Sequence, residues 1–254
     1  MDHLVCIENS TYHHWQIELL IQSFKIYGLQ DSLVVAIAEN YEPHFHDFTK
    51  NLTPHKRKFI HQNEGGPLNR VLAIRTALDN GLIEQPFYLL HADMLLYRPI
   101  NDEDLANVLY APDPTPAPDL SQLTGDFVVN PGGVMRFKTV PRSFFTSVGE
   151  YMKQMTGKYE LPLIDKMGWM LAMFQYQHIL EYKPAPYEVT LKHHDVVLPF
   201  IHYRDGLPPH FNKQQYLFKS HFSMGASPFE ALLETNPNSV TDYVQNVVKS
   251  YLAT

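Results

Sequence analysis

Short apolar runs alternate with amphipathic segments along the first hundred residues of the chain. Helical spacing of apolar positions predicts one helix from Trp15 to Tyr27, closed by Gly28, and a second helix opened by Pro67 and closed by Gly81. Buried strands are predicted at residues 4–7, 33–38, 59–60 and 87–90. This order of strands and helices predicts a parallel sheet with crossover helices.

A parallel sheet of this kind binds its ligands at the carboxyl ends of its strands. Polar segments follow the predicted strands, and we expect them to surround one crevice, at residues 8–10, 38–40, 62–66 and 91–94.

The second half of the chain is less regular. Its predicted elements are a proline-rich extended loop at 111–118, a strand at 127–129, a turn at 130–133, a strand at 134–137, a helix at 167–180, a strand at 196–202 and a packing helix from 239. The fold class is therefore α/β, with a mixed sheet, flanking helices and one domain.

Charge and cysteine content exclude some classes of protein. The 254 residues carry a formal charge of −7, which argues against a protein whose whole surface binds a nucleic-acid backbone. Cys6 is the only cysteine, so a disulfide framework and a cysteine zinc cluster are excluded. Neither a membrane span nor a signal peptide is predicted, and we expect a cytoplasmic protein.

The strand at 87–90 delivers a carboxylate, Asp93, just beyond its C-terminal end. Such a carboxylate can hold a divalent cation that neutralises a diphosphate, although an aspartate capping the next turn would explain it equally well. The segment resembles the aspartate-x-aspartate element of GT-A glycosyltransferases, with His91 in place of the first aspartate. The resemblance implies Mn²⁺ or Mg²⁺ held by Asp93 and by a late histidine, His202, and leaves open whether His91 binds the metal or the sugar.

Two further segments resemble the plant hydroxyproline O-arabinosyltransferase and peptidyl-serine galactosyltransferase families. The first matches at Tyr12, Trp15, Gln16, Leu20, Ser23, Phe24, Lys25 and Gly28. The second, at residues 66–70, opens a helix, and a helix N-terminus with a cation in its first turn attracts anions. We expect Arg70 to bind the donor diphosphate and Asn69 to contact the nucleoside. A GT-A-like domain would then comprise a nucleotide-binding half (about 1–100), an acceptor half (about 101–225) and a C-terminal helical segment (226–254).

One position departs from these relatives. Their W-x-x-E-M-Y segment carries a glutamate facing the transferred sugar, and Ala172 stands there in this chain. Asp165 or Gln175 is predicted to compensate as a catalytic residue. The remaining donor contacts are expected from Asn9, Ser10, Asp126, Gly133 and Lys213.

These residues predict a metal-dependent glycosyltransferase that moves a pentose or hexose from a UDP-sugar to a hydroxyl acceptor on a glycan, peptide or modified DNA base. A phage-type DNA glycosyltransferase is one alternative, motivated by Lys56, Arg57 and Lys58. An inactive sugar-nucleotide-binding module is another, motivated by Ala172. A metal-dependent phosphohydrolase is the third, built on His91, Asp93, His193, His194, Asp195 and His202.

Overall fold

The computed structural model describes residues 1–8, 11–38, 56–60, 64–96, 99–100, 103–113, 116–185, 188–190, 200–202, 246–247 and 250. Its strands are β1 (Asp2–Glu8), β2 (Leu33–Ala38), β3 (Lys56–Ile60), β4 (Phe87–Leu90), β5 (Met94–Leu96), β6 (Val108–Pro112), β7 (Pro131–Phe137), β8 (Tyr182–Pro184), β9 (Glu188–Thr190) and β10 (Phe200–His202). Its helices are α1 (Thr11–Ile26), η1 (Gln30–Ser32), α2 (Gly66–Asp79), α3 (Ser121–Thr124), α4 (Arg142–Met155) and α5 (Leu161–Gln175).

The described strands form a main sheet with a parallel and an antiparallel part. Seven of them follow the order β3-β2-β1-β4-β7-β6-β8. The first four are mutually parallel, whereas β7 runs antiparallel to both β4 and β6. Three short strands form a second sheet in the order β5-β10-β9. The predicted fold class, a mixed α/β sheet with flanking helices, is confirmed.

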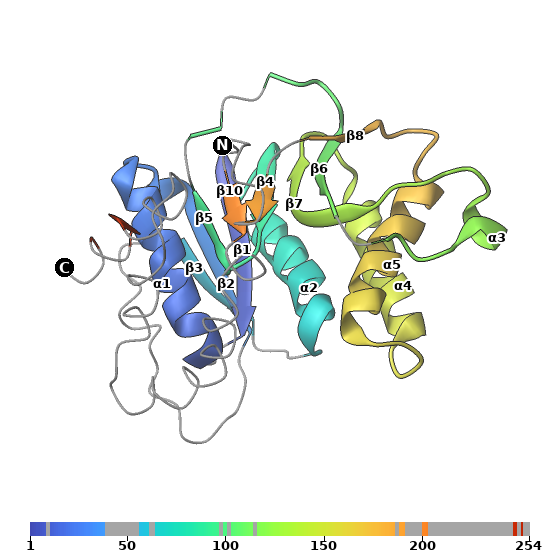
Figure 1. Cartoon of the computed structure of the whole chain (residues 1–254), viewed down its shortest axis with the longest axis horizontal. Helices are drawn as coiled ribbons and strands as arrows, with labels where there is room; N and C mark the ends of the chain where they lie inside the picture. Colours follow the sequence, from blue (N-terminus) through green and yellow to red (C-terminus); the bar gives the residue numbers. More distant parts are fainter. Residues whose placement is uncertain are drawn as a thin grey trace.

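Alternation along the central strands divides the core between the two faces of the main sheet. Leu4 and Val34 pack in one buried cluster, and Val5 and Val35 pack in another. Successive strand residues point to opposite faces, so these apolar runs bury both faces at once. Helix α1 covers one face, and α2 covers the other, with α4 and α5 alongside it (Figure 1).

The helix ends follow local chemistry. Gly28 and Gly81 adopt φ values of +66° and +62° after α1 and α2, as the sequence predicts. Helix α5 spans 161–175 instead of the predicted 167–180, because Pro162 in its first turn starts the helix earlier and Tyr176 closes it. None of the helices in the described part of the chain is both long enough and apolar enough to cross a membrane.

Three predictions for residues 111–133 were wrong, that of the loop at 111–118 only in part. Residues 127–129 do not form a strand, and Gly132 and Gly133 lie inside β7 instead of in a turn. Strand β6 also extends to Pro112, which pairs with Pro131 beyond a register shift that follows Tyr110. Proline is tolerated at the first residue of a strand and at such irregularities, so the strand pair continues into a segment whose composition favours a turn.

A buried histidine makes the stability of the fold sensitive to acid. His3 stacks on Tyr88, and its Nδ1–H donates to Ser32 Oγ, which itself donates to Leu29. Burial lowers the pKa of His3 from 6.5 to about 3. Below pH 6.5 the unfolded chain therefore binds a proton that the folded chain excludes, and stability falls as the pH falls towards 3.

Replacing His3 by phenylalanine is expected to remove this dependence. The wild-type free energy of unfolding should fall by up to about 1.4 kcal/mol per pH unit on this account below pH 6.5, and the variant should lack that share of the slope. Urea unfolding of both proteins at pH 7 and pH 5 measures the difference. Equal pH slopes in the two proteins would contradict a buried neutral His3.

Candidate functional site

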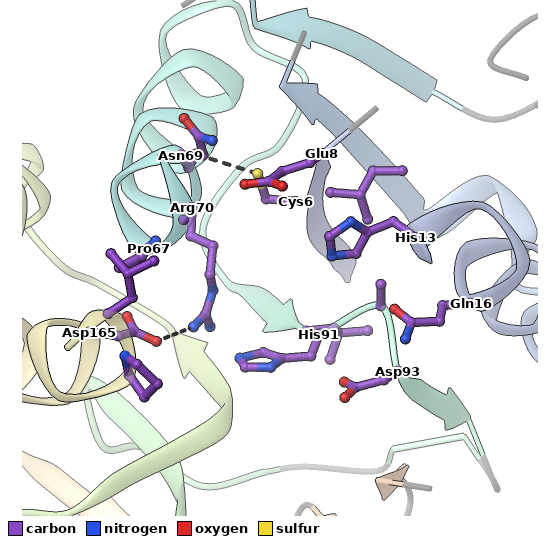
Figure 2. A pocket seen from close by; sticks show the side chains of 16 residues that line it. Cys6, Glu8, His13, Gln16, Pro67, Asn69, Arg70, His91, Asp93 and Asp165 are labelled. Carbon is purple, nitrogen blue, oxygen red and sulfur yellow. Dashed lines mark hydrogen bonds and ion pairs between the residues drawn. The ribbon is translucent and has the colours of Figure 1, made fainter. Parts of the chain in front are cut away.

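A cavity of about 300 Å³ opens where the carboxyl ends of β1 and β4 meet the starts of three helices. Its described walls come from β1 and α1 (Cys6, Ile7, Glu8, His13, Gln16), from α2 (Gly66, Pro67, Asn69, Arg70), from β4 and the turn after it (Leu90, His91, Ala92, Asp93) and from α5 (Leu161, Pro162, Asp165). Of the predicted crevice, Glu8, Gly66 and residues 91–93 line this cavity, whereas the described residue Ala38 at the end of β2 does not, and α5 adds a wall that was not predicted (Figure 2).

Asp93 reaches the cavity because the chain leaves the main sheet at this point. Strand β4 ends at Leu90 and β5 begins at Met94, so residues 91–93 turn between the two sheets. Strand β5 is tied to α1, since the backbone N–H of Leu96 donates to Ser23 Oγ at 2.9 Å. Asp93 is only 5% exposed, and the cavity is therefore lined by a carboxylate in a partly desolvated setting.

The predicted second metal ligand lies at a register position beside Asp93. Strand β10 runs antiparallel to β5, and the backbone of His202 is opposite that of Met94. The topology thus brings His202 opposite Met94, the residue that follows Asp93, although more than one hundred positions separate them in the sequence. His91 lies two residues before Asp93 and also lines the cavity.

Arg70 extends from α2 towards α5 across one side of the cavity (Figure 2). Its side chain is 13% exposed, and its Nη1 donates to Asp165 Oδ2 at 2.7 Å. Its Nε and Nη2 are buried and have no hydrogen-bond acceptor among the described residues. A buried donor without an acceptor costs about 1–3 kcal/mol, and more when charged, so these two atoms favour an anionic ligand in the cavity.

Asp165 stands at the cavity, whereas Ala172 does not. Asp165 Oδ1 accepts a hydrogen bond from Trp169 Nε1 at 3.0 Å, and its other oxygen binds Arg70. Ala172 is fully buried in the core, two turns further along α5. A glutamate at position 172 would therefore place its charge in the apolar core instead of in this cavity.

The described walls carry an excess of negative charge. Three carboxylates, on Glu8, Asp93 and Asp165, face one guanidinium, that of Arg70, which already pairs with Asp165. These described charges by themselves would repel an isolated diphosphate, and they would repel a diphosphate accompanied by a divalent cation less. Within the described residues, no group of three or more His, Cys, Asp or Glu side chains is placed to hold a metal ion.

Cys6, His13 and Gln16 line the cavity and were not among the predicted site residues. Only their positions could have identified them from the sequence. Cys6 lies near the end of β1, and His13 and Gln16 lie about one turn apart at the start of α1. Gln16 is 2% exposed, and its Nε2 is buried without an acceptor among the described residues. Burial raises the pKa of the Cys6 thiol to about 12, which excludes it as a thiolate nucleophile near neutral pH.

The structure does not bring every predicted site residue to this cavity. Asp126 is exposed beyond α3, Gly133 is buried within β7, and Gln175 is exposed at the far end of α5 from Asp165. None of these three belongs to the described walls. Predicted residues outside the described part of the chain are Asn9, Ser10, His193, His194, Asp195 and Lys213. Lys56, Arg57 and Lys58 lie in β3, which borders the main sheet next to β2.

No protein-family model matches the chain, and no curated protein matches it. A solved glycosyltransferase involved in the glycosylation of the major capsid of PBCV-1 aligns over 88% of this chain and 100% of its own, at 13% identity and a TM-score of 0.49. The glycosyltransferase GlyE of Streptococcus pneumoniae TIGR4 aligns over 88% of this chain and 63% of its own, at 11% identity and a TM-score of 0.48. Its apo form aligns over 89% and 64%, at 11% identity and a TM-score of 0.45. This chain thus spans less than two thirds of GlyE.

Proposed function

We propose that this protein is a glycosyltransferase that uses a nucleotide diphosphate sugar, with a UDP-sugar as the donor and a hydroxyl group as the acceptor. One observation carries the proposal. A single cavity at the carboxyl ends of β1 and β4 combines a buried carboxylate, Asp93, with the unsatisfied donors of Arg70 Nε and Nη2. The carboxylate suits a divalent cation and the guanidinium donors suit phosphate oxygens, so together they suit a diphosphate bound with a cation.

A divalent ion, Mn²⁺ or Mg²⁺, fits the chemistry of the donor set. Asp93 would hold it through carboxylate oxygens, which both ions prefer, and His91 and His202 would add imidazole nitrogens that suit Mn²⁺ better than Mg²⁺. When bound, the ion supplies positive charge that stabilises the diphosphate as it leaves the sugar.

The side chains of the cavity would bind and orient the donor. Arg70 would donate from Nε and Nη2 to phosphate oxygens, and would stabilise the negative charge that grows on them in the transition state. Asp165 would hold Arg70 in place. The buried side-chain amide of Gln16, on α1, would donate a hydrogen bond to another polar atom of the sugar nucleotide.

A thermal-shift screen of nucleotide sugars tests the proposal. At one hundred times its dissociation constant, a true donor adds roughly 2.7 kcal/mol of stability, which for a chain of this length raises the Tm by about 5–10 °C. We expect the largest shift with a UDP-sugar and Mn²⁺ together, and little shift with the sugar nucleotide plus a chelator. If no nucleotide sugar shifts the Tm with or without a metal, the donor assignment fails.

Turnover assays separate the rival functions. Transfer of the sugar to an added acceptor supports a glycosyltransferase. Binding without any transfer in a single-turnover assay would instead support an inactive sugar-nucleotide-binding module. Phosphate release from a range of phosphate esters, without any sugar acceptor, would support a phosphohydrolase. A product found only on hydroxymethylated DNA would identify the phage-type DNA glycosyltransferase.

A further inference from the structure

A hydrogen-bonded chain joins the aromatic core to the cavity. Trp169 is 2% exposed, and its ring stacks on Phe137 with centroids 5.8 Å apart. Its Nε1–H donates to Asp165 Oδ1 at 3.0 Å, and Asp165 Oδ2 accepts from Arg70 Nη1 at 2.7 Å. Residues 165 and 169 lie one turn apart on α5, whereas residue 70 comes from α2.

The rigid member of this chain is the indole. Trp169 is enclosed by Phe137 and Phe144, so its N–H direction is set by core packing. The Asp165 side chain is 25% exposed and would otherwise rotate between several staggered conformations. A donor of fixed direction on one carboxylate oxygen fixes the other oxygen, and that oxygen orients the planar guanidinium through Nη1.

This arrangement has a consequence for the rest of the guanidinium. Because Nη1 is committed to Asp165, the remaining donors Nε and Nη2 are held at the cavity wall without an acceptor among the described residues. An arginine on α2 alone would place its long side chain in many conformations, at a cost in entropy for each ligand bound.

We propose that Trp169 is a positioning residue, which acts through Asp165 to hold the Arg70 guanidinium in the orientation that receives the anionic ligand. The assignment of that ligand as a diphosphate rests on the proposed function. The coupling from the indole to the guanidinium does not.

A double-mutant cycle tests the coupling with UDP and Mg²⁺ as the probe. Trp169→Phe keeps an aromatic ring and removes the N–H, and should raise the Kd of UDP about five- to tenfold, a factor within the net worth of one ordinary hydrogen bond. In an Asp165→Ala background the same substitution should change the Kd less than about twofold, because the intermediary is gone. Equal factors in both backgrounds would overturn the proposal, as would no effect in the wild-type background.

The matched control is Phe145→Leu. Phe145 is fully buried, and its ring contacts among the described residues are with Phe87, Phe137 and Phe144, whereas those of the indole are with Phe137 and Phe144. The Phe145→Leu variant should have a lower Tm, as expected of a core substitution, and an unchanged Kd for UDP. If it weakens UDP binding as much as Trp169→Phe does, general packing explains the effect and the proposal fails.

A second readout needs no ligand. The chain has two tryptophans, Trp15 and Trp169, so ¹⁵N-labelled protein gives two indole N–H signals, which Trp15→Phe assigns. Arg70→Met should shift the Trp169 signal, whereas Arg75→Met, an exposed position on the same helix, should not. An unmoved Trp169 signal in Arg70→Met would overturn the coupling. A shifted signal in a protein that binds neither UDP nor pyrophosphate would support the coupling and refute the proposed function.

Discussion

Replacing Asp93 by asparagine is expected to reduce sugar transfer at least about a hundredfold, by analogy with the 10–100-fold losses that follow removal of groups that merely support a metal ligand. The substitution keeps the size of the side chain and removes its charge. The cavity would then have one carboxylate fewer to bind a cation. The diphosphate would lose the cation that offsets the negative charges of Glu8 and Asp165.

The measurement is kcat/KM for transfer from a UDP-sugar across a range of Mn²⁺ concentrations. We expect the variant to need far more Mn²⁺ than the wild type or to show no dependence on it. Asp126→Asn is the control, because Asp126 is an exposed carboxylate outside the described walls of the cavity. Full activity of the Asp93 variant in the presence of a chelator would refute the role of Asp93.

Replacing Arg70 by methionine should weaken binding of the donor diphosphate by about 2–5 kcal/mol, a factor of about thirty or more in Kd, because truncating one partner of a buried charge pair also leaves the other charge unpaired. The guanidinium contributes two hydrogen-bond donors that lack acceptors within the described residues. It also contributes positive charge to the described walls of the cavity. Methionine retains much of the length of the arginine's aliphatic stem.

Isothermal titration with UDP and Mg²⁺ measures this loss, and thermal unfolding reports the accompanying change in stability. Asp165 keeps its indole hydrogen bond but loses its cation in the variant. Adding Asp165→Asn should therefore recover stability without recovering UDP binding. Arg70→Lys keeps the charge and loses the Nε donor, so we expect an intermediate Kd. Wild-type affinity in Arg70→Met would show that the anion binds elsewhere.

The N-terminal half of the fold could be predicted from the sequence because its signals are local. Apolar runs gave β2 and β4 their predicted bounds, and glycines marked the ends of α1 and α2. Each of these signals acts within a few residues, through side-chain alternation or through the conformational freedom of glycine. The region from 111 to 133 was harder, because strand pairing there overrides a composition of prolines and glycines that favours turns.

The sequence alone determined that a carboxylate, that of Asp93, follows the end of a strand. It also determined that an arginine, Arg70, lies near the start of a helix. Only the tertiary structure decided which distant residues complete the site. Asp165 meets Arg70 across 95 positions, and the backbone of His202 lies opposite Met94, next to Asp93. It also decided that Ala172 and Gln175 lie away from the cavity while Gln16 lines it. Local patterns specify the conformation of a segment, but contacts between segments depend on how their buried faces pack together.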